Sequence, residues 1–494
     1  MAEDDASLAD EGSGHSGIPD PRSGAYDPPL SLAEGPTQAE QLAAFVERAA
    51  FSHLSKEVVL ALKVRVLDAL GCAIGALQGP PIRMLREDLD EFGGRPLVTL
   101  IGGGRTTPDQ AALYNGALVR YLDYNDAFLA KGETCHPSDN IAPVLAASEY
   151  AGRSGRDFLT ALAVAYQVQC RLSEEAPVRA KGFDHTTQGA YAVAAGVSRA
   201  LELDAARIAN AIGISGTACN ALRVTRTGRI SHWKGLAYPF TAFAATRATF
   251  LAMRGITGPI EVFEGNKGFM ESIAGPFRID WEHEGLSKVT ETILKKYNAE
   301  IHSQSALEGV LELREQYGIA PGDIEQVRID IFDVAYNIIG GGEEGDKRLV
   351  RTKEEADHSL HYMVAVALLD GEVTPRQYEP QRILREDVQN LLRRVVVRPS
   401  VDYSDCFPDE MCCRVEVVLA DGRTLTIEKR DYEGFRTRPM RWERLAAKFE
   451  SLAAPYTDAA LRHDIVQAVD ALDSIPVSDL TDLLARVKPG GISD

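Results

Sequence analysis

Between residues 38 and 275, apolar residues recur at the spacing of an α-helix, and this pattern constrains the fold more than any other feature of the chain. In residues 57–77 the apolar positions form a broad stripe along one side of a helix. The same period continues through alanine-rich segments at residues 111–122, 141–151, 158–173, 189–201, 205–219 and 237–254. Because small side chains let helices approach closely, the pattern predicts a large, multilayer helical domain.

The pattern changes near Pro276, where β-branched residues become frequent. They predict strands at residues 327–334, 394–398, 414–419 and 424–428. Asp421-Gly422, between the last two, is a strong signal for a hairpin turn. With helical segments at residues 305–317 and 358–370, residues 276–435 predict a smaller α+β domain.

The helical period returns after this domain. Residues 436–494 are therefore expected to form helices that pack back onto residues 38–275, which makes the helical domain discontinuous. The predicted fold class is mainly α.

Residues 1–37 are acidic, rich in Gly, Ser, Asp and Pro, and nearly free of large apolar side chains. They lack the basic start and apolar middle of a signal peptide, and also the arginine-rich, acid-poor character of a transit peptide. We expect a disordered tail and a cytoplasmic protein. No stretch approaches the roughly 20 apolar residues of a membrane span, so no membrane partner is expected.

The net charge of −19 argues against a nucleic-acid partner, because proteins that bind nucleic acid present a basic face. It does not exclude a small anionic ligand, since a closed site depends on local charge. The seven cysteines contain no C-x-x-C pair, so neither a zinc ribbon nor a disulfide framework is predicted. Reduced thiols are expected.

Three short patterns carry little weight. Residues 340–345 (GGGEEG) match G-x-G-x-x-G, but two glutamates stand where a pyrophosphate needs positive potential, so a loop is favoured. Residues 213–217 (GISGT) lack the final glycine of a nucleophile elbow. His358 and His361 could share a helix face, yet no third ligand is evident. One of them is expected to be buried and hydrogen-bonded. No metal and no cofactor is predicted.

Residues 121–140 (YLDYNDAFLAKGETCHPSDN) concentrate polar groups between two apolar helices. Asp123 and Asp126 flank a helix end, and His136 opens the approach to the next helix. Ser138 or its neighbour can cap that helix, which is the simpler interpretation of these residues. Capping alone does not explain why two acids and a histidine stand together here. Because a helix N-terminus also attracts anions, these residues are candidates for a site that binds an anionic ligand.

Further clusters follow along the chain. Residues 183–187 (FDHTT) place His185 before an alanine-rich helix. Residues 223–234 (RVTRTGRISHWK) hold three arginines, a histidine and a lysine without one acid, although an exposed basic loop is an equally favoured interpretation. Lys295 and His302 belong to another basic and imidazole cluster.

Taken together, these segments resemble the MmgE/PrpD family, and in particular its members that dehydrate 2-methylcitrate. The resemblance runs through about residues 40 to 450, with six motifs in family order: ALVRYLDYNDAF, HPSDNIAPVLAASE, FDHTT, SHWKG, KKYNAEIHSQSALE and ADHSLHYMVAVALLDG. It implies a large helical domain, a smaller α/β lid, an active site between them, and a homodimer.

The matching motifs imply catalytic roles for Asp123, His136, His185 and Lys234. The expected substrate-binding residues are Ser138, Asn140, Arg223, Arg226, Lys295, His302 and His358. Lys296 replaces Lys295 if the matching shifts by one residue. Family members often have threonine where this chain has Ala127, so a hydrogen bond to the substrate is expected to be missing there.

The implied reaction removes a proton from a carbon beside a carboxylate and expels a hydroxyl from the neighbouring carbon. Without a metal motif, Lys234, Lys295 and the arginines are the candidates to stabilise the developing charge. An unperturbed pKa of about 6.5 suits histidine to proton transfer, so His136 and His185 are the expected acid and base, in either order. Asp123 is expected to orient a histidine, or to act as base if burial raises its pKa.

The expected function is dehydration of a small carboxylate, 2-methylcitrate, to 2-methyl-cis-aconitate in the methylcitrate cycle of propionate catabolism, with hydration of citrate or aconitate as a further activity. The alternatives are a cis-aconitate decarboxylase, or another lyase or isomerase of di- and tricarboxylates. A carboxylate-binding protein without catalysis is disfavoured by the presence of both histidines, Asp123 and Lys234.

Overall fold

The computed structural model describes residues 35–491 of the chain. The tail expected at residues 1–37 lies outside these residues except for its last three. Of these, Thr37 is buried and caps the first helix, α1 (Gln38–Arg48), by accepting a hydrogen bond from the Glu40 backbone N at 3.1 Å. The Glu40 carboxylate accepts the Thr37 N–H in return, so the helix begins with a reciprocal capping box.

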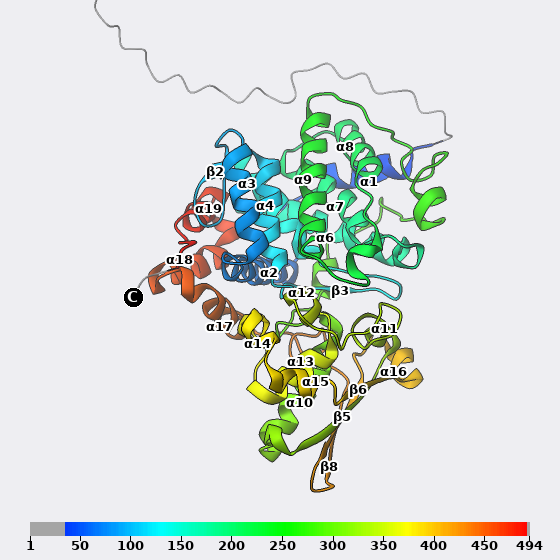
Figure 1. Ribbon diagram of the computed structural model, residues 1–494. Coiled ribbons are helices and arrows are strands. Elements are labelled where there is room, and N and C mark those ends of the chain that lie inside the picture. Colours follow the sequence, from blue (N-terminus) through cyan, green and yellow to red (C-terminus); the bar gives the residue numbers. More distant parts are fainter. Residues whose placement is uncertain (1–34, 492–494) are drawn as a thin grey trace, which may run out of the picture.

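The upper part of the molecule in Figure 1 is helical. Its N-terminal helices are α1, α2 (Lys56–Gly75), α3 (Pro80–Phe92), α4 (Pro108–Tyr121), α5 (Ile141–Tyr150), α6 (Gly155–Glu175), α7 (Thr186–Ala200), α8 (Ala205–Ala218) and α9 (Trp233–Met253). Small residues allow close packing at its centre: a Cβ on Gly189 of α7 would lie 2.4 Å from the ring of Tyr238 of α9. This contact packs the start of α7 closely against the second turn of α9.

The C-terminal helices are α17 (Trp442–Ala453), α18 (Ala459–Asp470) and α19 (Val477–Ala485); α17 and α18 pack against α2, and α19 packs against α5 (Figure 1). Leu445 and Phe449 of α17 belong to the same buried core as the apolar face of α2. The helical domain is therefore completed by the end of the chain.

The lower part of the molecule is a smaller α+β domain (Figure 1). Its sheet has the order β6-β5-β7-β8, in which β5 is parallel to β6 and the other neighbours are antiparallel. The strands are β5 (Ile324–Ile331), β6 (Val395–Pro399), β7 (Cys413–Leu419) and β8 (Thr424–Lys429). The helices are α10 (Gln304–Tyr317), α11 (Asp333–Ile339), α12 (Lys353–Ala356), α13 (Leu360–Asp370), α14 (Pro380–Ile383), α15 (Glu386–Leu392) and α16 (Val401–Cys406).

The structure confirms the predicted fold class, a mainly α chain with a smaller α+β domain. The strands predicted at residues 394–398, 414–419 and 424–428 are confirmed as β6, β7 and β8. The strand predicted at residues 327–334 is partly wrong, because α11 begins at Asp333. There the Ser404 hydroxyl accepts the Asp333 N–H at 2.9 Å and the chain turns, which local alternation cannot reveal.

Two buried cores show where the chain changes domain. Trp281 and Val289 still belong to the helical core, whereas Ala299 belongs to the α+β core. The sequence placed this change at residue 276, at the point where composition shifts. At the other end, Phe435 lies in the α+β core and Met440 in the helical core. Within residues 35–491, no helix is both long enough and apolar enough to cross a lipid bilayer.

Candidate active site between the two domains

A narrow cavity lies where the helical and α+β domains meet. It is lined from both sides by Arg120, Asp123, Glu133, Thr134, His136, Arg179, His185, Arg223, Arg226, Glu300, His302, Ile338 and His358. The cavity volume is about 40 Å³, room for roughly three water molecules. Each domain contributes two histidines to its wall.

Helix ends bring the helical-domain residues to this cavity. Asp123 follows α4 in a left-handed backbone conformation, with φ of 55°. His136 precedes the 3-10 turn η2 (Pro137–Asn140), which leads into α5, and His185 precedes α7. The left-handed conformation is unusual for a residue other than glycine, so buried contacts must hold Asp123 in place.

Those contacts are three cations. The Asp123 Oδ1 atom accepts from Arg120 Nη1 at 2.5 Å and from Lys295 Nζ at 2.8 Å. Its Oδ2 atom accepts from Lys234 Nζ at 3.1 Å. Burial opposes ionisation, but the three cations outweigh it and hold the pKa of Asp123 well below its usual value. Asp123 is therefore an anchoring carboxylate, and the condition for it to act as a base is not met.

Asp357 is the corresponding carboxylate of the α+β domain. Its Oδ1 atom lies 2.7 Å from Lys234 Nζ and 3.0 Å from His358 Nδ1, and its Oδ2 atom accepts from Lys353 Nζ at 2.7 Å. Burial lowers the pKa of His358, and the Lys234 ammonium lowers it further. Lys234 thus bridges Asp123 and Asp357 and joins the two domains beside the cavity.

His136 has a defined tautomer. Its Nδ1 atom lies 2.7 Å from the main-chain carbonyl oxygen of Asp126, which can only accept, so Nδ1 carries the proton. Burial, followed by Arg120 and Lys295, lowers the pKa of His136 well below its usual value. The ring is neutral, and its Nε2 atom carries a lone pair that can take a proton.

His185 stands edge-on to His136, with the ring centroids 5.6 Å apart. Its Nδ1 atom is 3.3 Å from Asp184 Oδ1, and Arg226 Nε donates to Asp184 Oδ2 at 2.9 Å. Burial lowers the pKa of His185 to about 3, although Asp184 raises it. Its Nε2 atom is buried and has no hydrogen-bond partner among residues 35–491. A bound ligand would satisfy this nitrogen.

His302 faces the cavity from the α+β domain. Its Nδ1 atom lies 2.7 Å from Glu300 Oε1, and its Nε2 atom lies 3.4 Å from the Thr134 hydroxyl. Burial raises the pKa of Glu300, but the imidazoles of His302 and His358 and the Lys295 ammonium together outweigh burial and bring the pKa to about 2. Thr134 belongs to a short hairpin, β3 (Phe128–Leu129) and β4 (Thr134–Cys135), that reaches from the helical domain.

Arg223 closes the cavity across the domain boundary. Its Nη2 atom donates to Glu344 Oε1 at 2.5 Å. Glu344 belongs to residues 340–345, which form a loop after α11, as the favoured interpretation of GGGEEG predicted. The cavity that this ion pair closes is too small for a ligand larger than a few waters.

The comparison with known families agrees with this architecture. The MmgE/PrpD N-terminal domain matches residues 40–282, and the MmgE/PrpD C-terminal domain matches residues 297–474. The chain belongs to the MmgE/PrpD family.

Curated MmgE/PrpD relatives are named for two reactions. The 2-methylcitrate dehydratase of Escherichia coli (strain K12) is 30% identical over 346 residues, which are 64% of this chain and 68% of the relative. The 2-methylcitrate dehydratase of Cupriavidus necator is 29% identical over 459 residues, 85% and 91% of the two chains. The cis-aconitate decarboxylase of Mus musculus is 25% identical over 472 residues, 90% and 93% of the two chains. Family membership therefore leaves the reaction open.

Most of the residues expected from the MmgE/PrpD motifs meet at the cavity. Those on its wall are Asp123, His136, His185, Arg223, Arg226, His302 and His358. Lys234 and Lys295 lie directly behind the wall on Asp123. Lys296 instead pairs with Glu308 at 3.0 Å, so the structure places Lys295 and not its neighbour at the site.

Two expected substrate-binding residues are not on the wall. The Ser138 hydroxyl accepts from Asn125 Nδ2 at 2.9 Å, and Asn140 Nδ2 donates to Gln169 Oε1 at 2.6 Å, so both residues use their polar groups inside the protein. Ala127, where a hydrogen bond to the substrate was expected to be missing, is buried in the α+β core. These positions support the fold beneath the site.

Motif reasoning missed several charged residues that shape the site, among them Arg120, Arg179, Asp184, Glu300 and Asp357. Arg120 stands one helical turn before Asp123 on α4, and an i,i+3 Arg/Asp pair is a signal that sequence offers. Asp184 directly precedes His185, the pattern of a carboxylate that orients an imidazole. Arg179 and Glu300 give no comparable local signal.

Asp123, Asp357 and His358 bring three ligand atoms within 4.8 Å of one another, close enough to hold a metal ion. The Lys234 ammonium lies between the two carboxylates, 3.1 Å from Asp123 and 2.7 Å from Asp357. The positive charge that these acids require is thus supplied by the protein itself.

Proposed function

We propose that the chain is a hydro-lyase that dehydrates 2-methylcitrate to 2-methyl-cis-aconitate, as in the methylcitrate cycle of propionate catabolism. The observation that carries the proposal is the pair of neutral, buried imidazoles of His136 and His185, 5.6 Å apart on the wall of a cavity rich in arginine. The names of the Escherichia coli and Cupriavidus necator relatives support the choice of substrate.

The charge around the cavity suits a polycarboxylate. Burial lowers the pKa values of Arg179 and His136, and the neighbouring guanidiniums of Arg223 and Arg120 lower them further. The effect of these guanidiniums indicates positive potential that a bound anion would relieve. A carboxylate bound beside these guanidiniums can also replace Glu344 as the partner of Arg223 when the domains reopen and close on a substrate.

The hydrogen-bond partners of His136 and His185 differ, and this difference indicates which of them is the base and which is the acid. His136 donates to a neutral carbonyl and keeps a lone pair on Nε2, which suits a base that removes the proton from carbon. His185 has the Asp184 carboxylate beside Nδ1, which stabilises an imidazolium. Negative charge from a bound polycarboxylate raises the pKa of His185 from its low value, so that it can deliver a proton to the departing hydroxyl.

Direct assay tests the proposal. Purified protein is incubated separately with 2-methylcitrate, citrate and cis-aconitate, and the products are identified by mass spectrometry. A product 18 mass units lighter than 2-methylcitrate is expected, through loss of water. No change in any of the three substrates would overturn the proposal and favour a carboxylate-binding protein.

Cis-aconitate decarboxylation is the second candidate, because the Mus musculus enzyme of that name aligns with 90% of this chain. Its developing carbanion needs the same cations, so the site geometry favours neither reaction. Release of CO₂ from cis-aconitate, with no water lost from 2-methylcitrate, would assign the chain to this activity.

Turnover is expected to survive exhaustive chelation. Lys234 already occupies the space between Asp123 and Asp357, so no divalent cation is required there. Initial rates are measured before and after dialysis against EDTA, with residual metal quantified by mass spectrometry. Loss of activity that added divalent cation restores would contradict the metal-free mechanism.

The pH profile is expected to lack a histidine inflection at about pH 6.5, the ordinary histidine value. The pKa values of His136 and His185 are both lowered, the latter to about 3, so the free enzyme keeps them neutral as pH falls through that range. After correction for substrate ionisation, kcat/KM should decrease steadily as pH rises, without a break near pH 6.5, because His185 must take up a proton from solution before it can act as the acid.

The carboxyl group of Asp139 could also produce an inflection in the pH profile, and the variant D139N distinguishes it from the histidines. Burial raises the pKa of Asp139 to about 7, and this carboxyl lies 3.7 Å from Arg120 Nε. An inflection near pH 7 that disappears in D139N belongs to Asp139 and leaves the histidine prediction intact. One that persists in D139N refutes it.

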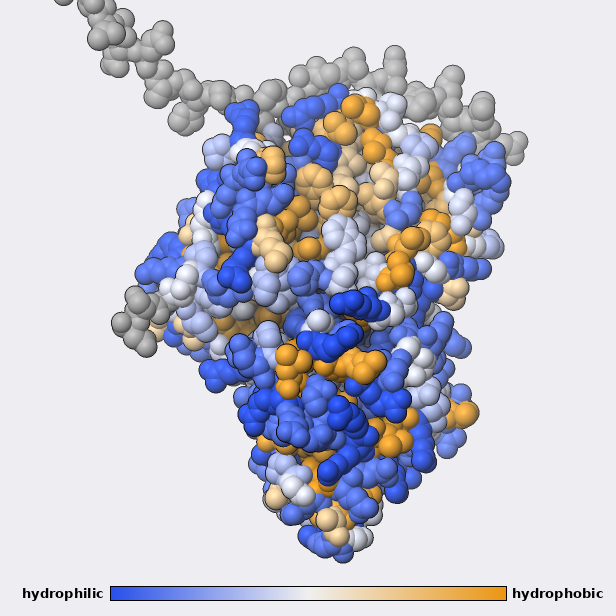
Figure 2. Space-filling view, viewed as in Figure 1, coloured by the Kyte–Doolittle hydropathy of each residue, from blue (hydrophilic) through white to orange (hydrophobic). Residues whose placement is uncertain are grey.

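We also propose a cytoplasmic homodimer. All seven thiols are free, which agrees with a reducing compartment. Apolar side chains gather on the face of the helical domain around α9 (Figure 2). Four large apolar side chains that line one hollow beside α9 are 46–69% exposed: Leu222, Val224, Trp233 and Phe240. Burying such a patch stabilises association.

Light scattering on a sizing column tests this interface. The wild-type protein is expected to have twice the mass of the chain, and W233S/F240S is expected to shift toward the monomer. F92S, at an exposed phenylalanine elsewhere, is the control and should remain a dimer. A monomeric wild type, or a double variant that stays dimeric, would reject the patch as the interface.

A further inference from the structure

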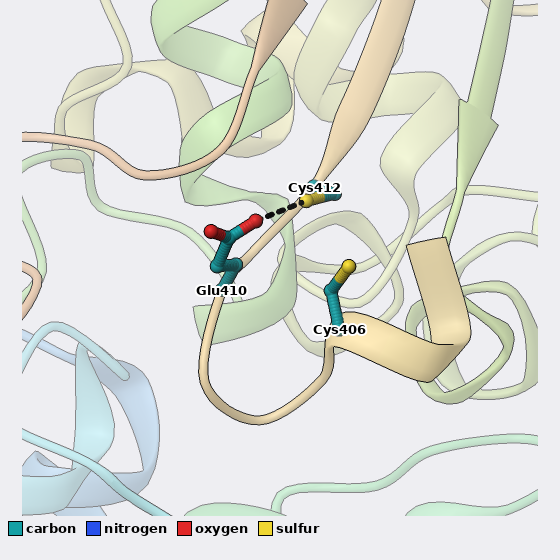
Figure 3. A group of neighbouring side chains, drawn as sticks. All are labelled: Cys406, Glu410 and Cys412. Atoms are coloured by element: carbon teal, nitrogen blue, oxygen red, sulfur yellow. Dashed lines mark hydrogen bonds between the residues drawn. The ribbon is translucent and has the colours of Figure 1, made fainter. Parts of the chain in front are cut away.

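A second cluster of ligand atoms lies in the α+β domain, away from the cavity. Cys406 ends α16, Cys412 immediately precedes β7, and Glu410 lies in the loop between them (Figure 3). The two sulfurs and a carboxylate oxygen lie within 4.8 Å of one another. The Cys412 thiol already donates to Glu410 Oε2 at 3.2 Å.

The spacing suits a thiophilic cation. Tetrahedral zinc with Zn–S bonds of about 2.3 Å separates its ligand atoms by about 3.8 Å. Figure 3 shows the two thiols and the carboxylate turned toward one shared space. Shifts of these ligand atoms by up to about 1 Å are therefore enough to complete a three-ligand site.

Accessibility also fits. Cys412 is buried, whereas Cys406 and Glu410 are partly exposed, so a cation and a water ligand can enter from solvent. Arg430 binds Glu410 Oε2 at 2.6 Å, but its side chain is 64% exposed and can swing away. We propose that Cys406, Glu410 and Cys412 form a binding site for a thiophilic divalent cation such as Zn²⁺, with solvent as the fourth ligand.

Binding of the cation releases protons from the two thiols. Each thiol loses its S–H proton to the buffer as its sulfur forms a bond to the cation, and the carboxylate binds without losing a proton. Burial raises the pKa of the Cys412 thiol, with the Glu410 carboxylate adding to the rise. Affinity should therefore increase with pH.

The site is connected to the cavity by the same loop. The Phe407 ring stacks on Phe332, with centroids 4.7 Å apart and planes at 11°, and lies 5.7 Å from the His302 ring. A cation that joins the two ends of the loop would fix Phe407 behind His302. The site itself is independent of the proposed dehydratase activity, and its test does not rely on turnover.

Cobalt is the probe. The full chain is freed of metal, kept reduced with a phosphine, and titrated with Co²⁺. We expect one equivalent to produce a near-ultraviolet sulfur-to-cobalt charge-transfer band that Zn²⁺ abolishes by displacement. The group formed by Asp123, Asp357 and His358 contains no sulfur, so binding there cannot give this band.

Single substitutions test which side chains bind the cation. C406S and C412S should each remove most of the band, and E410Q should weaken Co²⁺ binding by at least about tenfold, the loss seen even for outer-shell partners of metal ligands. D409N, on the exposed neighbour that pairs with Arg436, and C219S, at a distant thiol, should bind as the wild type does.

Three results would overturn the proposal. They are absence of the band in the reduced wild type, its retention in C406S, and its equal loss in C219S. C406S remains informative if C412S fails to fold, because Cys406 is the more exposed thiol. If the reduced protein binds no Co²⁺ but loses two titratable thiols on mild oxidation, the pair is a disulfide-forming one and the cation site is rejected.

Discussion

Replacing His136 or His185 by glutamine is expected to lower kcat by about 10²–10⁴-fold while leaving Tm nearly unchanged. Both rings line the cavity, and His185 leaves a buried Nε2 atom without a partner among residues 35–491. A nitrogen without a protein contact contributes nothing to folding, so its loss should appear in turnover rather than in stability.

The cost to stability is expected to be small for a further reason. His136 makes one hydrogen bond, to the Asp126 carbonyl, and such a bond contributes about 1 kcal/mol. Glutamine can still donate to that carbonyl. Turnover and thermal unfolding should be measured on the same preparations, with H283Q as control, because the His283 side chain is 76% exposed and does not line the cavity. Variants that unfold early but turn over normally at low temperature would make these histidines structural.

The sequence could predict the helices and most strands of the four-stranded sheet. Alanine-rich segments such as residues 189–201 carry both the helical period and the small side chains that close packing requires, and the structure places α7 there. The turn after β5 could not be predicted, because it depends on Ser404, a residue far along the chain. The change of core after Val289 likewise follows from packing that composition does not record.

The candidate site was predictable only where the sequence itself marked it. His136 and His185 stand at helix starts within recognisable motifs, and both reach the cavity. Lys234 was expected to face the substrate, yet the structure places it behind Asp123, in contact with Asp357. Motif position gives a residue's neighbours along the chain, whereas its role here is set by a carboxylate from the other domain.

The second large effect is expected from Asp123→Asn, which should destabilise the fold by about 3–5 kcal/mol as well as lower turnover. The amide matches the carboxylate in shape but leaves Arg120, Lys234 and Lys295 without their shared anion. All three cations are buried, so water cannot replace the lost charge. Lys234→Ala should be milder in stability, because Asp123 keeps two cations.

The difference in stability between wild type and D123N should disappear at low pH, because the pKa of Asp123 is lowered in the folded protein. Asp123 has a folded-state pKa well below its usual value, so its contribution is fully present above about pH 3.9 and is lost as pH falls through the lower folded value. Urea unfolding of wild type and D123N should therefore differ most at neutral pH and converge in acid. E271Q, which breaks the exposed ion pair of Glu271 with Lys267, is the control and should match the wild type at neutral pH. A gap between wild type and D123N that is small at neutral pH, or equally large in strong acid, would mean that Asp123 does not hold the cations together.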